Sequence, residues 1–115
     1  MPKPRQRQWL LVIFAPSKTD PEYMAFRHEL NSRPMDLLEH DILVMEALEE
    51  GKSHVDGTEI DATAASSVRR RFKAQPGQFS IVLADKAGMV MFESRKAVGL
   101  DELIGIIHNA PRTVT

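Results

Sequence analysis

The stretch WLLVIFAPSKTDPEY, residues 9–23, joins an uninterrupted apolar run to a helix start and decides the fold class. The run from Trp9 to Ala15 contains no polar side chain, which is typical of a strand buried on both faces of a sheet. Asp20 can cap a helix, and Pro21 suits the first helical position, where a missing N–H costs nothing. A central strand followed at once by a helix predicts an α/β protein.

Strand and helix patterns continue to alternate along the chain. Apolar residues spaced by three and four predict helices that begin near Pro21, Asp61 and Leu100. Apolar runs predict further strands over residues 42–48, 79–84 and 89–93, of which the last two are joined by a turn at Gly88.

This order, βαβαββα, predicts the architecture of the sheet. Strands separated by helices pair in parallel through right-handed crossovers, and the last two strands form an antiparallel hairpin. We therefore expect a mixed four-stranded sheet with helices on both sides. The pair Asp56–Gly57 favours a tight turn, so the acidic stretch around it can also form a small hairpin.

The chain length indicates one domain over residues 1–115, because single domains cluster near 100–150 residues. We expect residues 1–7 and 111–115 to be tails outside its core. The composition, 43% hydrophobic and 27% charged, is ordinary for a globular protein.

The net charge of −1 gives the molecule no field that would attract nucleic acid or an anionic membrane. No apolar run approaches the roughly 20 residues that span a bilayer. We therefore expect neither nucleic acid nor a membrane as a partner. Carboxylates gather between Asp36 and Asp61, and we interpret this stretch as an exposed face.

The chain has no cysteine, which excludes disulfides, thiolate metal sites and cysteine nucleophiles. A chain without thiols is indifferent to the redox state of its compartment. Basic residues before Trp9 imitate a secretory signal, but the apolar run up to Ala15 lies at the lower limit of length for a signal core, and we interpret it as a buried strand. We expect a cytoplasmic protein if Met1 is the native start, and a secreted or periplasmic one if a signal peptide has been removed.

Three segments together resemble a known family: LLVIFAPSKTDPEY (residues 10–23), ATAASSVRRRFKAQPGQFSIVLADKAG (62–88) and LDELIGIIHNAP (100–111). The family is the thioredoxin-like domain of unknown function 4174, which also occurs in coiled-coil-domain-containing protein 80 and in sushi-repeat-containing proteins. The resemblance covers about residues 8–111. It implies a mixed four-stranded sheet between helices and a molecular activity that is poorly defined.

Redox chemistry does not follow from this resemblance. Residues 16–20 occupy the loop in which a thioredoxin carries its cysteines. The place of its cis-proline falls near Phe79 or Ser80, whereas the nearest proline is Pro76. Thiol–disulfide oxidoreductase and peroxiredoxin activities are excluded because no thiolate is available.

The loop after the first strand is the first candidate ligand site, formed by Ser17, Lys18, Thr19 and Asp20. Free backbone N–H groups at a helix start can hold an anion or a ligand carboxylate. The alternative is simple capping, because Asp20 can occupy the cap itself and oppose a bound anion.

The second candidate is a basic patch formed by Arg69, Arg70, Arg71 and Lys73. It can contact phosphates or a phosphorylated partner, but it lacks the interleaved aromatic residues that stack on bases. An exposed, solvated helix face is the simpler interpretation.

The histidines do not predict a metal site, and no motif predicts a cofactor. The four histidines are His28, His40, His54 and His108. No two of them are three or four residues apart, the spacing that places two zinc ligands on one face of a helix. No catalytic residue is assigned, because nucleophile elbows and phosphate loops are also absent.

Most of the methionines, including Met24, Met35 and Met45, fall at apolar positions of the sequence pattern. We therefore expect them to fill the core. The strand over residues 89–93 is expected at a sheet edge, where it can pair with a second copy of the chain. A homodimer through this edge is therefore a hypothesis.

The sequence leaves two functions open. The first is a non-redox protein-interaction or ligand-binding module without catalytic activity. The second is a small-molecule or anion-binding enzyme or carrier that uses the corner after the first strand.

Overall fold

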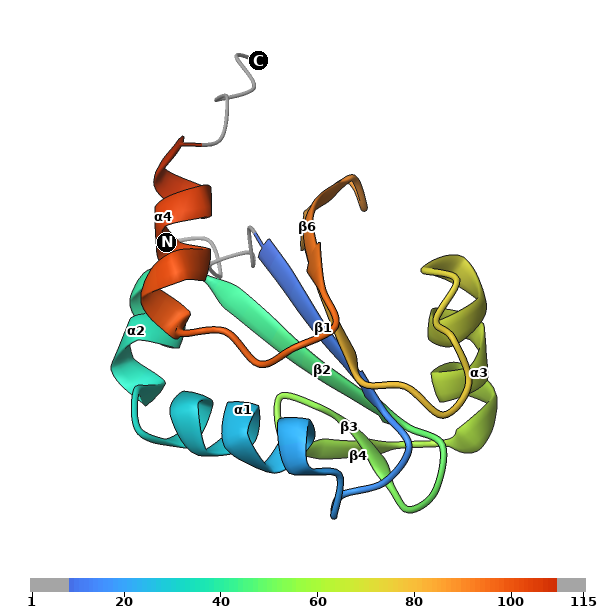
Figure 1. Ribbon diagram of the computed structural model, residues 1–115. Coiled ribbons are helices and arrows are strands. Elements are labelled where there is room, and N and C mark those ends of the chain that lie inside the picture. The colour runs from blue at the N-terminus through green and yellow to red at the C-terminus, as the bar shows by residue number, and fades with distance from the viewer. Residues whose placement is uncertain (1–8, 110–115) are drawn as a thin grey trace.

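The computed structural model describes residues 9–109, which form a six-stranded sheet with helices on both faces (Figure 1). The strands are β1 (Trp9–Ala15), β2 (Ile42–Leu48), β3 (Ser53–Val55), β4 (Thr58–Ile60), β5 (Ser80–Asp85) and β6 (Val90–Ser94). The helices are α1 (Pro21–Asn31), α2 (Pro34–Glu39), α3 (Ala62–Arg71) and α4 (Leu100–Asn109). The strand order across the sheet is β4-β3-β2-β1-β5-β6. The tails predicted at residues 1–7 and 111–115 lie outside the described residues.

β1 is a central strand, as its apolar run predicts. It pairs in parallel with β2 and antiparallel with β5. The five consecutive residues from Leu11 to Ala15 are all buried. Both faces of this strand are therefore covered, which explains why the sequence shows no alternation of polar and apolar residues there.

The sheet has six strands, so the expected count of four is wrong. The hairpin β3–β4 adds two strands beyond β2 through the pairs Met45–Val55 and Glu46–His54. Its turn places Asp56 and Gly57 at positive φ, the backbone conformation that this residue pair favours. Asp56 also joins the hairpin to β2 through two hydrogen bonds. Its backbone N–H donates to the Val44 carbonyl, and its Oδ1 accepts from the Val44 N–H.

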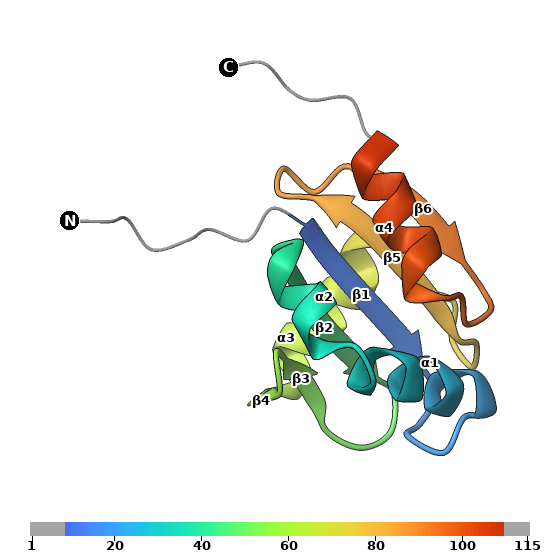
Figure 2. The same cartoon turned by 90° about the vertical axis from the view of Figure 1, so that its left-hand side faces the viewer.

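The two faces of the sheet have separate cores. Helices α1, α2 and α4 lie on one face and α3 on the other (Figure 2). The larger core packs residues of α1 and α4 against alternate residues of β1, β2 and β5; its members include Leu11, Ile13, Phe26, Leu30, Ile81, Leu83, Leu100 and Leu103. The smaller core contains Val12, Phe14, Ala47, Ala65 and Val82, with Val68 and Phe72 of α3 packed against it. The predicted arrangement of helices on both sides is confirmed.

Several methionines lie at the surface, and the prediction that Met24 and Met35 fill the core is wrong. Met24, Met35 and Met89 are 56%, 61% and 66% exposed. In α1 the inward face is taken by Tyr23 and Phe26, which turns Met24 outward. Met45 is half-buried against the smaller core.

Candidate functional site

The corner after β1 is closed by hydrogen bonds among its own residues. Oδ2 of Asp20 accepts from the Tyr23 N–H at 3.0 Å, so Asp20 caps α1 as its position predicts. The hydroxyls of Ser17 and Thr19 are 2.9 Å apart, and Ser17 Oγ also accepts from the Thr19 N–H. The side chain of Lys18 points into open surroundings, since Lys18 is exposed. This geometry favours capping over ligand binding at the corner.

The basic run of α3 divides into two parts. Arg69, Arg70 and Lys73 line one open cavity of about 510 Å³ together with residues of the following loop. The Arg71 guanidinium instead lies over the Phe72 ring, 5.7 Å from its centroid, and against Gly88 of the β5–β6 turn. The structure therefore brings together three members of the predicted patch and directs the fourth elsewhere.

The carboxyl-terminal edge of β1 and β2 contains a second, smaller cavity beside Arg69. Its volume is about 60 Å³, and it is lined by Phe14 and Ala15, by Glu49 and by residues 74–76 and 78 of the loop before β5. The Glu49 carboxylate accepts a hydrogen bond from the Gly77 N–H at 2.7 Å, which ties this loop to the end of β2.

A buried charged cluster lies on the opposite face of the sheet. Glu46 of β2 is only 3% exposed and faces α1. The Tyr23 hydroxyl donates a hydrogen bond to Glu46 Oε1, and Arg27 Nη1 lies 3.2 Å from Oε2. Both carboxylate oxygens therefore have partners, which is the condition under which a charge is tolerated inside a protein.

Burial is the main reason that the pKa of the Tyr23 hydroxyl is raised well above its ordinary value, and its hydrogen bond to Glu46 acts in the same direction. The folded protein therefore holds the Tyr23 proton more tightly than the unfolded chain does.

Sequence analysis missed Glu46, although a signal was present. Ile42, Val44 and Leu48 alternate along β2 on the buried face, and Glu46 occupies the same register. A single carboxylate at such a position predicts buried cationic or hydrogen-bonding partners. The identity of these partners depends on α1, which packs over the strand.

A groove of about 470 Å³ lies beside this cluster, between helices α1 and α2 and strand β2. Its apolar lining includes Leu30, Leu37, Leu38, Ile42 and Val44, and its polar lining includes Arg27 and Glu46. Leu38 is 51% exposed, and Met35 of the same helix is exposed as well. This groove combines apolar walls with a few polar groups, as binding sites commonly do.

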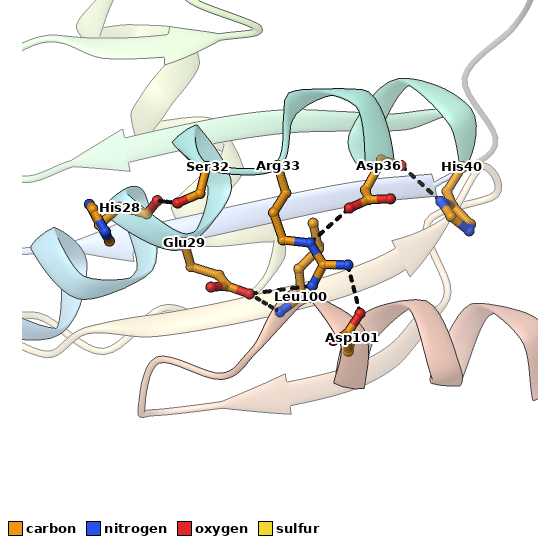
Figure 3. A network of polar contacts seen from close by, with 8 residues as sticks. All are labelled: His28, Glu29, Ser32, Arg33, Asp36, His40, Leu100 and Asp101. Atoms are coloured by element: carbon orange, nitrogen blue, oxygen red, sulfur yellow. Dashed lines mark hydrogen bonds and ion pairs between the residues drawn. The ribbon is translucent and has the colours of Figure 1, made fainter.

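An ion-pair network fixes the helices that flank the groove (Figure 3). The Arg33 guanidinium contacts Asp36 of α2 at 2.7 Å, Asp101 of α4 at 2.7 Å and Glu29 of α1 at 3.7 Å. Its hydrogen bond to Asp101 holds the pKa of that carboxyl below its usual range. Glu29 also accepts from the Leu100 N–H at the start of α4. The network therefore joins three helices on one face of the sheet.

The four histidines do not gather at one site, although two of them are neighbours. His40 and His108 lie together, with ring centroids 5.3 Å apart, but no cluster of three metal-ligating His, Cys, Asp or Glu side chains occurs within residues 9–109. His54 lies on β3 and His28 on α1.

Over residues 9–109, every helix is too short or too polar to cross a membrane.

The sheet order, the flanking helices and the corner after β1 define a thioredoxin-like α/β domain without a thiol. A solved structure of the bacterioferritin comigratory protein of Xanthomonas campestris, described for its alkyl peroxide reduction activity, has a similar fold with a TM-score of 0.63. The two proteins are 14% identical, and the match covers 90% of this chain and 78% of that one. At this identity the similarity establishes the fold alone.

This chain belongs to the DUF4174 family, the Domain of unknown function (DUF4174), whose family profile matches residues 2–113. The match confirms the resemblance found in the three sequence segments. No curated protein matches the sequence.

Proposed function

We propose that this domain is a non-redox binding module that holds an apolar segment of a partner protein in the groove between α2 and β2. The observation that carries the proposal is the groove itself, which stays open beside the exposed side chain of Leu38. Transferring such apolar surface out of water on binding is favourable, at about 25 cal/mol per Å².

The framework around the groove supports this role. Arg33 links α2 to α1 and α4, so the wall that carries Leu38 is held in place before a partner arrives. A preformed site loses less conformational freedom on binding, which leaves more of the interaction energy as affinity.

The experiment selects ligands from a library of short random peptides and maps them by amide chemical shifts. We expect selected peptides to be rich in apolar side chains and to perturb the amides of Leu37, Leu38 and Val44. Leu38→Asp is expected to weaken binding by about tenfold or more, as for other residues that anchor an interface. Met89→Asp is the matched control, because Met89 is equally apolar and exposed but lies in the β5–β6 turn. Failure to select any peptide, or equal weakening by both variants, would contradict the proposal.

The alternative function places an anion-binding enzyme or carrier at the corner formed by Ser17, Lys18, Thr19 and Asp20. Because Asp20 already caps α1 and Ser17 and Thr19 bond to each other, the geometry favours the groove. The corner nevertheless makes a distinct prediction, which is that removing Lys18 abolishes anion binding.

Strand β6 supports a further partner proposal, the homodimer. β6 is an edge of the sheet, and Val90 at its start is 40% exposed. If two β6 strands pair, sedimentation experiments are expected to show the mass of a monomer at low protein concentration and twice that mass at high concentration. The variant Val90→Lys is expected to stay monomeric, because a charged residue on an edge strand opposes strand pairing. A monomeric mass at all concentrations would contradict this proposal.

A further inference from the structure

We propose that Arg69, Arg70 and Lys73 bind the phosphate group of a small ligand at the carboxyl ends of β1 and β2. The site consists of two cavities that share Arg69: the larger one of about 510 Å³ and the smaller one of about 60 Å³. The smaller cavity has about twice the volume that one water molecule occupies in the liquid. Together they offer space for a compact anion beside Arg69 and for the rest of a ligand above it.

The position of Arg69 gives the first argument. Its Nε is buried, and no group within residues 9–109 forms a hydrogen bond with it. A buried donor without a partner is costly, and almost all such groups in folded proteins are satisfied. Nε has almost no accessible surface in this structure, so a small shift of the Arg69 side chain would let an oxyanion in the adjoining cavity accept from this N–H and remove the cost.

The local charge balance gives the second argument. Three cations line the larger cavity, whereas Glu49 is the carboxylate that lines the smaller one. Glu49 already accepts from the Gly77 N–H. Among the residues that line these two cavities, positive charges exceed negative ones by two, which favours an anion such as a phosphate group of charge about −1.5 to −2 near neutral pH. A single carboxylate would balance only one of the two excess charges. Glu59 and Asp61 line the neighbouring cavity that Arg69 also borders.

The simpler interpretation is that cations at the end of α3 offset the partial negative charge of the helix terminus. That interpretation suits Arg70 and Arg71, which are exposed. It does not account for Arg69, whose Nε is turned away from water. The last carbonyls of α3 are also satisfied already, since those of Arg69 and Arg70 accept from the N–H groups of Ala74 and Lys73.

The place of the cavity in the fold gives the third argument. In open α/β sheets, ligands bind outside the carboxyl ends of the parallel strands. β1 and β2 are parallel, and the smaller cavity is lined by Ala15 at the end of β1 and by Glu49 directly after β2. The loop over residues 74–78 closes it from the side of β5.

This site is independent of the groove between α2 and β2, because the two have no lining residue in common. Binding of a peptide in the groove and binding of phosphate at this site are therefore separate tests, and the result of one does not determine the result of the other.

The test is calorimetric titration of the full chain with inorganic phosphate and with phenyl phosphate, at constant ionic strength maintained with chloride. We expect saturable binding of both and a Kd that rises about 10- to 100-fold in Arg69→Gln, the loss typical of a hydrogen bond to a charged group. Arg69→Lys keeps the stem and the charge but lacks Nε and the planar fork, so an intermediate loss is expected. Circular dichroism and urea unfolding check that each variant is folded.

Matched controls separate this site from a diffuse charge effect. Arg71→Gln removes the same charge from the same helix but outside the cavity, and is expected to change the Kd less than about threefold. Absence of saturable binding to the wild-type protein, or equal weakening in Arg71→Gln, would overturn the proposal. Loss of binding in Lys18→Ala would place the anion at the corner instead. Equally tight binding of succinate with the same dependence on Arg69 would show a carboxylate site and overturn the assignment to phosphate.

Discussion

Replacing Phe26 with alanine is expected to lower the free energy of unfolding by about 3–5 kcal/mol, the range for deleting a buried phenylalanine side chain. Phe26 is fully buried where α1 meets the sheet. Its ring meets Phe79 edge-on, with centroids 6.3 Å apart. The loss is large because a domain of this kind is stable by only about 5–15 kcal/mol in total. Urea unfolding followed by the fluorescence of the single tryptophan measures it.

Met24→Ala is the matched control for this prediction. Met24 lies on the same helix but is mostly exposed, so its removal is expected to change stability by less than about 0.5 kcal/mol. Similar losses in the two variants would show that α1 does not pack on the sheet through Phe26.

Glu46→Ala is expected to cost about 3 kcal/mol, the lower end of the range for breaking a buried ion pair. The substitution leaves the Tyr23 hydroxyl without its acceptor in a buried place. Arg27 can turn toward water because its side chain is 38% exposed, which keeps the cost from being larger. Urea unfolding provides the measurement, with Glu50→Ala as the control because Glu50 is exposed.

A second variant keeps this prediction testable if Glu46→Ala does not fold. Glu46→Leu combined with Tyr23→Phe removes both buried polar groups, and it is expected to retain more stability than Glu46→Ala because neither group is left unpaired. A loss below about 0.5 kcal/mol in Glu46→Ala would contradict a role of the cluster in stability.

The single tyrosine of the chain offers an independent readout of the same cluster. The pKa of Tyr23 is raised in the folded protein, so its contribution to stability is complete below the unfolded value of about 10 and is lost as the pH rises further. Ultraviolet titration is expected to show tyrosine ionisation above its ordinary range in the wild-type protein and a lower pKa in Glu46→Ala. An unchanged titration would show that Glu46 does not contribute.

Local signals account for what sequence analysis predicted correctly. Asp20 and Asp61 are helix caps because the side chain of each reaches an N–H three residues on. Gly88 lies at positive φ in the β5–β6 turn, as expected for a hairpin connection. The helix stripe of Tyr23, Phe26 and Leu30 is buried as its spacing requires.

Errors and omissions arose where distant segments meet. The exposure of Met35 follows from how the short helix α2 sits on the sheet, and apolar character at one position does not fix that. The basic run looked uniform along α3, yet Arg69 faces the ends of β1 and β2 while Arg71 lies against Phe72. Consecutive helix residues point in directions about 100° apart, so neighbours in sequence need not share a site.

The sequence by itself determined the class of fold, the central position of β1, the start of α1 and the absence of thiol chemistry, because each depends on residue types within a few positions of one another. Only the tertiary structure decided that the hairpin β3–β4 joins the sheet, that Glu46 is buried against Tyr23 and Arg27, and that Arg69 lines one cavity with Glu49 and the loop before β5. These contacts join residues far apart in the chain. Their geometry is set by how helices pack across the sheet, and no local pattern encodes it.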